Sequence, residues 1–291
     1  LKGFVYWEPN YLLLPFDGPS VATIHDISHL RMPEHHPSAR ITEMNTHLPH
    51  TLARATRLIA VSAFTRNEII SCLKPTQPID IVSPGVDRTF FDISAQDCLG
   101  VKGRHNLPPE FILSVATLEP RKNLVRLVEA FAALPESLRS RYPLVLAGSR
   151  GWHTHKIESL INPLLSSGQV RLPGYVDQAD MPALYSSATL LAYVSLYEGF
   201  GMPIAEAMAA GTAVLTSATS AMPEVASGHA TLVDPEDTHA IQQQLFHLLT
   251  HPDERNLQAQ SARQHANTFD WAHSAQQLLH SLQAAQQEHN Q

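Results

Sequence analysis

Two glutamates lie eight positions apart in the segment EGFGMPIAE, which runs from Glu198 to Glu206. The turn between them offers three consecutive backbone N–H groups, those of Gly199, Phe200 and Gly201. Where such a turn opens a helix, these groups and the positive end of the helix dipole can bind the oxygens of a diphosphate. Glu206 can accept hydrogen bonds from the vicinal hydroxyls of a ribose, as acids do in nucleotide-binding folds. Glu198 precedes the glycines, so it lies on the opposite side of the phosphates, where a sugar would be attached.

A strand and a helix must position this segment. Residues 190–195, LLAYVS, predict a buried strand, and Pro203 suits a first helical turn, where its missing N–H and fixed φ cost nothing. The run IAEAMAA contains strong helix formers and Gly211 supplies the residue after the helix, so we expect Glu206 in the first turn. A dinucleotide fingerprint and a plain loop are the alternatives. The first is disfavoured because GFGMPI lacks the third small residue of G-x-G-x-x-G.

A second group of charged residues, Glu119-Pro120-Arg121-Lys122-Asn123, follows the β-rich run FILSVATL. Ligands of open α/β sheets bind beyond the carboxyl ends of the strands, and this group follows such an end. A lysine offers a point charge and an arginine a planar fork, and both suit phosphate oxygens. A solvated helix start is the alternative. It is disfavoured because cations there oppose the helix dipole, so that something anionic should compensate them.

His25 stands at the end of the strand-like run VATI and is followed by Asp26. A single histidine is more often structural than functional, but its place at the carboxyl end of a strand favours a role in the site. His29, His35 and His36 have no comparable argument. The 17 histidines are scattered along the chain, and the sequence is expected to hold no metal site.

Composition and charge exclude several classes of protein. The chain has 291 residues, of which 44% are apolar, enough for two α/β domains with cores. Its net charge is −7 and it has no lysine-arginine cluster, which argues against nucleic acid as a partner. Cys72 and Cys98 form no ligand pattern and indicate free thiols in a reducing compartment. No apolar run is long enough for a membrane span and no signal peptide is visible, so the sequence predicts a cytoplasmic protein.

Strands alternate with helices along most of the chain, which predicts parallel, doubly wound sheets. Ser62 is expected to cap the amino end of a helix over AFTRNEIISCL, and residues 92–106, which are polar and contain glycine, are expected to be a linker. The expected strands cover 21–24, 57–62, 79–83 (running into a Pro-Gly turn over 84–87), 111–118, 143–148, 169–175, 190–195, 213–217 and 230–234. The expected helices cover 38–55, 63–73, 124–134, 181–188, 203–210 and 268–287.

The segment EGFGMPIAE resembles the signature of retaining nucleotide-sugar glycosyltransferases of the GT-B fold, the group 1 or family 4 class. The likeness extends through the chain in order, over HDISHL, VSAFTRNEI, SPGVD, LSVATLEPRKNL, LVLAGSRGW, LPGYV, ALYSSA and AMPEVA. An ordered series of this kind is far more specific than one motif. The resemblance implies an α/β protein with two Rossmann-like domains, each built on a doubly wound parallel sheet, that face a cleft.

The resemblance also implies roles for the residues singled out above. By likeness, Glu198 contacts the donor sugar, the amides of residues 199–201 hold the diphosphate, and Glu206 binds the ribose. Lys122 corresponds to the diphosphate lysine of the family. A histidine in the position of His25 lies near the transferred sugar and helps to position the reaction.

One position departs from the family pattern. Many relatives have an arginine about six residues before the diphosphate lysine, but Ala116 stands there in this chain, which makes Arg121 the candidate for its role. The family reacts on one face of the sugar, and the departing phosphate helps to deprotonate the acceptor hydroxyl. The resemblance implies no cofactor, and no metal is required if cations already neutralise the diphosphate.

The donor and acceptor are suggested by three motifs, HDISHL, TLEPRKNL and LAGSRGW, which most resemble those of bacterial mannosyltransferases and rhamnosyltransferases of surface-polysaccharide assembly. GDP-mannose is therefore the expected nucleotide-sugar donor, and a lipid-linked saccharide at the inner face of the cell membrane is the expected acceptor. His50, Arg54 and Arg57 are spaced as one helical face that could meet anionic lipid. A solvated face is the favoured alternative.

We expect residues 1–104 to form the acceptor-side domain, with a helix over 272–291 crossing back to it, and residues 105–271 to form the donor domain. The first domain is expected to be incomplete, because the family has a longer one, so the sequence resembles an N-terminally truncated enzyme. One alternative is a donor-binding module without turnover. Another is a sugar-nucleotide epimerase, which would release nucleotide with no acceptor. A phosphorylase would need a pyridoxal-phosphate lysine, for which there is no signature.

Overall fold

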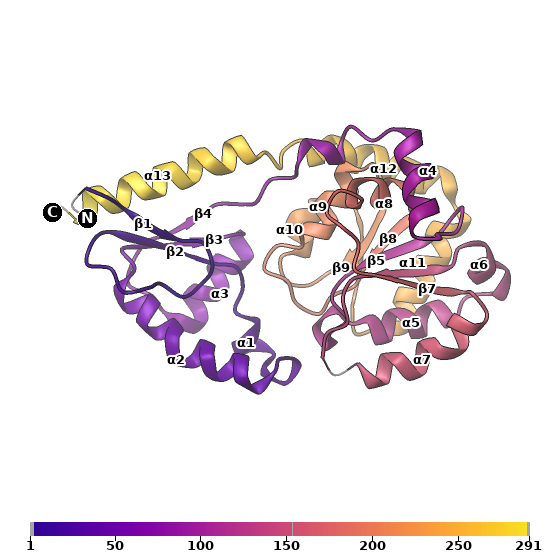
Figure 1. Cartoon of the computed structure of the whole chain (residues 1–291), viewed down its shortest axis with the longest axis horizontal. Coiled ribbons are helices and arrows are strands. Elements are labelled where there is room, and N and C mark those ends of the chain that lie inside the picture. The colour runs from indigo at the N-terminus through magenta and orange to yellow at the C-terminus, as the bar shows by residue number, and fades with distance from the viewer. Residues whose placement is uncertain (1–2, 153, 290–291) are drawn as a thin grey trace. The chain divides into compact units, whose positions relative to one another are not determined.

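The computed structural model describes residues 3–152 and 154–289, and these form two compact units. The first unit contains the chain up to Gly85, the short segment Glu198–Phe200, and the chain from Phe269 onward. The second unit contains Val86–Tyr197 and Gly201–Thr268. Each unit is a parallel sheet with helices on both faces (Figure 1).

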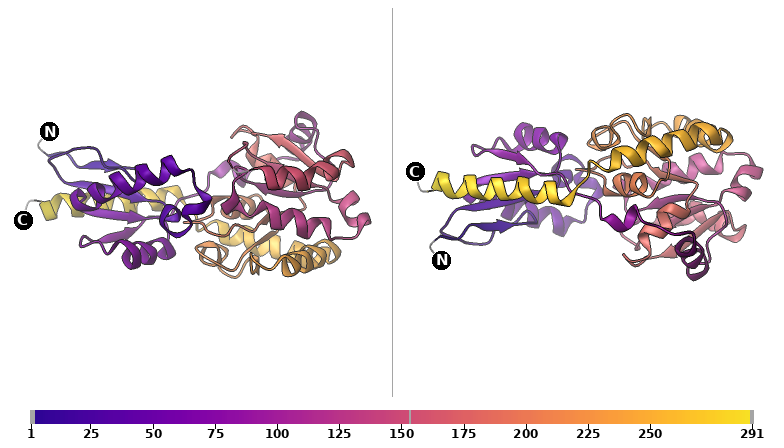
Figure 2. Two further views of the ribbon diagram at one scale, coloured as in Figure 1. Left: turned by 90° about the horizontal axis from the view of Figure 1, so that it is seen from below. Right: turned by 90° about the horizontal axis from the view of Figure 1, so that it is seen from above.

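The first unit is built on four parallel strands in the order β1-β2-β3-β4. Helices α2 and α3 cover one face of this sheet and α13 covers the other, as all three views show (Figures 1 and 2). Because both faces are covered, β2 is buried along its whole length. The strands are β1 (Tyr6–Glu8), β2 (Ser20–Ile24), β3 (Arg57–Ala60) and β4 (Ile79–Ile81); the helices are α1 (Ser28–Arg31), η1 (Pro33–His35), α2 (Ser38–Arg54), α3 (Ala63–Leu73) and α13 (Trp271–His289).

The last helix, α13, packs on the first sheet through a small apolar cluster. Val21 on β2 and Ile59 on β3 are buried with Ala285 of the helix. At the start of the helix the Ser274 hydroxyl donates to the Ser83 carbonyl at 2.5 Å. Gly85 is needed here, because a Cβ at this residue would lie 2.4 Å from the Trp271 backbone nitrogen.

The basic face predicted for α2 is wrong at one of its three members. The helix ends at Arg54, because the backbone turns to the extended conformation at Ala55, and Arg57 is the first residue of β3. The Arg57 guanidinium hydrogen-bonds Asp80 on β4 at 2.8 and 2.9 Å and also pairs with Glu288 of α13. This side chain therefore joins β3, β4 and α13.

Among the described residues, no helix combines the length and apolarity that crossing a membrane requires.

The second unit is built on six parallel strands in the order β10-β9-β8-β5-β6-β7. Helix α5 packs with α7 and α11 on one face, and α9 packs with α8, α10 and α12 on the other (Figure 1). The strands are β5 (Ile112–Val115), β6 (Leu144–Ala147), β7 (Val170–Gly174), β8 (Leu190–Tyr193), β9 (Val214–Ser217) and β10 (Thr231–Val233); the helices are η2 (Arg88–Phe90), α4 (Ala95–Arg104), η3 (Pro120–Lys122), α5 (Leu124–Ala132), α6 (Glu136–Arg141), α7 (His155–Ser166), α8 (Met181–Ser187), α9 (Met202–Ala209), α10 (Met222–Ala226), α11 (Thr238–Thr250) and α12 (Pro252–Ala266).

The linker predicted over residues 92–106 is wrong, because most of it is helix α4. Ser94 and Asp97 form a reciprocal capping box at its amino end, a signal that the sequence carries. At its other end, Arg104 and His105 both contact Asp180, at 2.5 and 2.8 Å. Helix α4 lies in the second unit, which begins at Val86, whereas the donor domain was expected to begin at residue 105.

Candidate functional site

The strand order of the second unit creates a switch point between β5 and β8. In chain order the sheet is 3-2-1-4-5-6, so the connections from these two central strands leave in opposite directions, and ligands of such sheets bind beyond the carboxyl ends at that point. The two loops that leave the strands are tied together there. The Leu196 N–H donates to the Arg121 carbonyl at 2.9 Å, and the Asn123 side-chain amide donates to the Val194 carbonyl at 3.0 Å. The loop that carries the first charged motif is thus joined to the chain that leads into the second.

Helix α9 begins immediately after the glycine turn. Gly201 precedes it with φ +102°, a conformation that favours glycine, and a proline, Pro203, lies in the first turn as expected. At the other end, Gly211 has φ +73° and donates to the Met208 carbonyl at 3.0 Å, while Thr212 donates to the Ala207 carbonyl at 2.9 Å. These two bonds form a Schellman motif, so both predicted ends of the helix are confirmed.

Glu206 is the fifth residue of α9, in its second turn, so the expectation that it lies in the first turn is wrong. The helix already begins at Met202, two residues before the apolar run from which the expectation was drawn. The Tyr185 hydroxyl donates to Glu206 Oε2 at 2.8 Å. Burial raises the pKa of Glu206, and this hydrogen bond opposes the rise. The sequence motif ALYSSA contains Tyr185, but no local pattern marks it as the partner of an acid.

Lys122 ends the short helix η3 and faces an aromatic residue of β8. Its Nζ donates to the Tyr193 hydroxyl at 3.0 Å and lies 5.4 Å from the centroid of the same ring. Tyr193 is the last residue of β8 and is buried. Tyr193 was not predicted as a site residue, because only the pairing of β5 with β8 brings it beside the lysine.

Arg121 is held by two groups of its own unit. Its guanidinium donates to Glu119 at 2.8 Å and to the Tyr197 carbonyl at 2.7 Å. The sequence led us to expect an anion that compensates the cations before α5. The buried Glu119 carboxylate is such an anion, because it pairs with Arg121. Arg121 therefore ties the loop after β5 to the loop after β8, with its charge compensated inside the protein.

His25 follows β2 directly, and its side chain is exposed. Its Nε2 lies 2.8 Å from the Pro9 carbonyl oxygen, and its ring meets the Tyr11 ring edge-on at 5.5 Å between centroids. Since a carbonyl only accepts, Nε2 carries the hydrogen of this contact. The neighbouring Asp26 carboxylate is engaged locally, because it accepts hydrogen bonds from the N–H and the hydroxyl of Ser28, at 2.8 and 2.7 Å.

The segment Glu198–Phe200 belongs to the first unit, although the strand and helix on either side of it belong to the second. The Gly199 carbonyl accepts hydrogen bonds from the Ser62 hydroxyl at 2.6 Å and from the Thr65 hydroxyl at 2.9 Å. Ser62 is also the amino-terminal cap of α3, as predicted, and accepts from the Thr65 N–H. Glu198 beside this glycine is buried. The first unit thus holds Gly199 and His25 together.

Gly199→Ala is expected to abolish the glycosyl transfer that the sequence resemblance implies, because its Cβ would stand 1.8 Å from the His25 carbonyl oxygen and the backbone would have to move. We expect a loss of at least about a hundred-fold in turnover. The matched control is Gly103→Ala in α4, where a Cβ meets nothing within 4 Å. Turnover and thermal midpoint measured side by side would contradict this steric argument if the two variants behaved alike.

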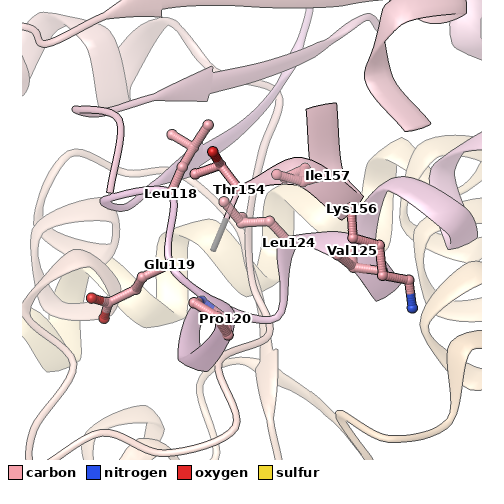
Figure 3. Close-up of a pocket in the computed structure, with 8 residues that line it drawn as sticks. All are labelled: Leu118, Glu119, Pro120, Leu124, Val125, Thr154, Lys156 and Ile157. Carbon is pink, nitrogen blue, oxygen red and sulfur yellow. The ribbon is translucent and has the colours of Figure 1, made fainter. Parts of the chain in front are cut away.

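A cavity of about 180 Å³ lies beside the candidate site, between the loop after β5 and the start of α7 (Figure 3). The Glu119 carboxylate points away from the apolar members of the lining (Figure 3). Neither Lys122 nor Glu206 lines this cavity, so it is distinct from the predicted donor site. The lining residues are Leu118, Glu119, Pro120, Leu124, Val125, Thr154, Lys156 and Ile157.

Within residues 3–152 and 154–289, no cluster of three or more His, Cys, Asp or Glu could hold a metal ion.

Comparison with known proteins identifies the family. Residues 100–265 match the model of the group 1 glycosyl transferases, and residues 4–90 match that of glycosyltransferase family 4. The chain is 34% identical to O-antigen chain mannosyltransferase B of Escherichia coli, over 96% of this chain and 74% of that protein. It is also 34% identical to the serotype-specific mannosyltransferase WbdA of E. coli, over 76% of this chain but only 28% of that protein.

Solved structures share the fold at lower identity. Sucrose-phosphate synthase from Thermosynechococcus elongatus matches with a TM-score of 0.78 and 24% identity, over 93% of this chain and 69% of that one. Anabaena HepE in complex with UDP-glucose matches with a TM-score of 0.78 and 21% identity, over 91% of this chain and 72% of that one. The two parallel-sheet units are those of the GT-B fold that the sequence predicted. The chain belongs to the group 1 glycosyltransferases and is a glycosyltransferase.

Proposed function

We propose that this chain transfers mannose, with retention of configuration, from GDP-mannose to a saccharide acceptor of the O-antigen type, carried on a lipid. The observation that carries the proposal is that the two loops leading into the charged motifs leave neighbouring strands at the switch point between β5 and β8 and are hydrogen-bonded to each other. There, Lys122 and the loop that leads into α9 stand beyond the carboxyl ends of neighbouring strands. The names of the E. coli relatives support mannose and the O-antigen, and the UDP-glucose complex of HepE supports a nucleotide-sugar donor.

The proposed donor contacts follow from charge. Negative charge accumulates on the diphosphate as its bond to the anomeric carbon breaks, so fixed positive groups lower the barrier. Lys122, the amides of residues 199–201 and the amino end of α9 supply this stabilisation. Arg121 contributes less, because Glu119 already compensates it. With these groups neutralising the diphosphate, we expect transfer to continue in the presence of EDTA.

The proposed sugar contacts are Glu198 and His25. Both belong to the first unit, and Gly199 links them because its carbonyl and Cα pack against Ser62, Thr65 and the His25 carbonyl. In this proposal they position the transferred sugar, and the departing phosphate accepts the proton of the acceptor hydroxyl. Neither residue acts as a covalent nucleophile.

Transfer can be tested with purified chain, a panel of nucleotide sugars and saccharide acceptors, followed by mass spectrometry of the product. The proposal expects a hexose to be added from GDP-mannose, with the α-configuration of the donor kept in the product. Transfer from UDP-glucose alone would contradict the choice of mannose. Release of free nucleotide with an altered sugar and no acceptor would favour an epimerase, and binding without any product would favour a donor-binding module.

Glu206→Ala is expected to weaken nucleotide binding itself, because Glu206 is proposed to hold the ribose. Loss of a charged hydrogen-bonding partner corresponds to about ten-fold in affinity for GDP, measured by calorimetry. The control is Glu110→Ala, which removes a carboxylate that precedes the amino end of β5 and pairs with Arg141 at 3.0 Å. An unchanged affinity in folded Glu206→Ala protein would remove Glu206 from the site.

A further inference from the structure

Tyr185 is a fully buried residue of α8 whose hydroxyl group is hydrogen-bonded to a carboxylate. Its hydroxyl donates to Glu206 Oε2 at 2.8 Å. The rest of the residue is held firmly: its carbonyl accepts from the Thr212 hydroxyl at 2.6 Å, and its ring packs against Phe90 with centroids 5.9 Å apart. A donor fixed in this way holds one oxygen of a carboxylate on the neighbouring helix in one place.

The protonation states of the pair suit this arrangement. Burial, and then the charge of Glu206, raise the pKa of Tyr185 well above 10, so the phenol remains an O–H donor. Burial raises the pKa of Glu206, and the hydrogen bond from Tyr185 lowers it. The tyrosine therefore favours the charged form of the carboxyl, which is an acceptor only and suits two ribose hydroxyls.

The elements that pack against α9 carry other titratable groups: Arg88 on η2, Glu224 on α10, Arg255, Arg263 and His265 on α12, and Tyr193 on β8. On α12, Arg255 donates to the Leu248 carbonyl at 2.8 Å, and Arg263 reaches the Phe91 carbonyl. Tyr193, at the end of β8, acts electrostatically on Tyr185 and accepts from Lys122. Tyr185, by contrast, hydrogen-bonds Glu206.

We propose that Tyr185 is a positioning residue for donor binding, which holds the Glu206 carboxylate charged and oriented toward the ribose hydroxyls of the nucleotide. This inference rests on the proposed function, in which Glu206 binds the ribose. It assigns a role to a residue that touches neither the nucleotide nor the sugar. Tyr185 acts through Glu206 alone.

The test is the affinity for GDP as a function of pH, measured by calorimetry from about pH 4.5, near the ordinary pKa of a glutamate, up to about pH 8.5. The variants are Tyr185→Phe, Glu206→Gln and the double variant. Without the hydroxyl the pKa of Glu206 rises further, so charge and affinity are lost at a higher pH as the solution is acidified. We expect Tyr185→Phe to weaken binding about ten-fold at the acidic end and only a few-fold at the alkaline end.

Two controls separate positioning from packing. Tyr142→Phe changes another buried tyrosine of the same unit, which lies just before β6 at the amino ends of the strands, and should leave the pH profile unchanged. On the Glu206→Gln background there is no carboxyl to titrate, so Tyr185→Phe should have no pH-dependent effect. If Tyr185→Phe disturbed the fold, its loss of affinity would persist on that background.

The outcomes distinguish the inference from the function on which it rests. If the unaltered chain binds neither GDP nor UDP, the proposed function fails and this inference fails with it. If the chain binds GDP and Glu206→Gln weakens binding, but Tyr185→Phe parallels the unaltered protein at every pH, only the inference is overturned. A shifted profile that disappears on the Glu206→Gln background supports it.

Discussion

Glu198→Gln should reduce turnover by about a hundred-fold or more while leaving the affinity for GDP nearly intact. The substitution keeps the size of this buried side chain and removes its charge. Because Glu198 is proposed to contact the sugar, its loss is felt only when the sugar is present and reacting. Turnover with GDP-mannose and calorimetry with GDP measure the two halves of this expectation. Glu110→Gln, at the amino end of β5, is the matched control for loss of a carboxylate.

His25→Ala should give the same pattern, since both residues are placed by the first unit. The histidine side chain is exposed, so the substitution removes the contact with the Pro9 carbonyl and the T-shaped contact with the Tyr11 ring but little buried packing. If either substitution abolished GDP binding in folded protein, the residue would belong to the nucleotide part of the site. Unchanged turnover would remove it from the reaction.

Lys122→Ala should reduce the affinity for a nucleoside diphosphate more than that for the nucleoside, because the lysine is proposed to address phosphate alone. Turnover should fall by about a hundred-fold in addition, since the leaving-group charge that it stabilises grows in the transition state. Isothermal titration with GDP and guanosine, together with initial rates, measures both effects. Lys102→Ala is the control, because that lysine donates to the Pro109 carbonyl beside α4.

Equal losses for GDP and guanosine would contradict a phosphate contact and indicate a folding defect. The expected difference between Lys122 and Arg121 sharpens the test. Arg121→Ala leaves the buried Glu119 without its guanidinium partner, so it should lower the thermal midpoint of the protein, whereas Lys122→Ala should change it little.

The amino-acid sequence by itself determined the elements whose signals are local. Apolar runs such as residues 190–193 are buried strands because both sheet faces are covered, and Ser62 caps α3 because its side chain reaches an N–H three residues on. Pro203 and Gly211 mark the ends of α9 through their own backbone preferences. The ordered motifs also determined the family, and the spacing of the acids singled out Glu198 and Glu206.

Only the tertiary structure decided which side chains meet. Tyr185 reaches Glu206 across 21 positions, Lys122 reaches Tyr193 across 71, and Ser62 reaches Gly199 across 137. No periodicity or spacing encodes such pairs, because they depend on strand order and on how helices pack over a sheet. The same reason explains the error at Arg57, which is held by Asp80 and Glu288, both distant in the chain. The error at α4 is different, because its capping box of Ser94 and Asp97 is a local signal.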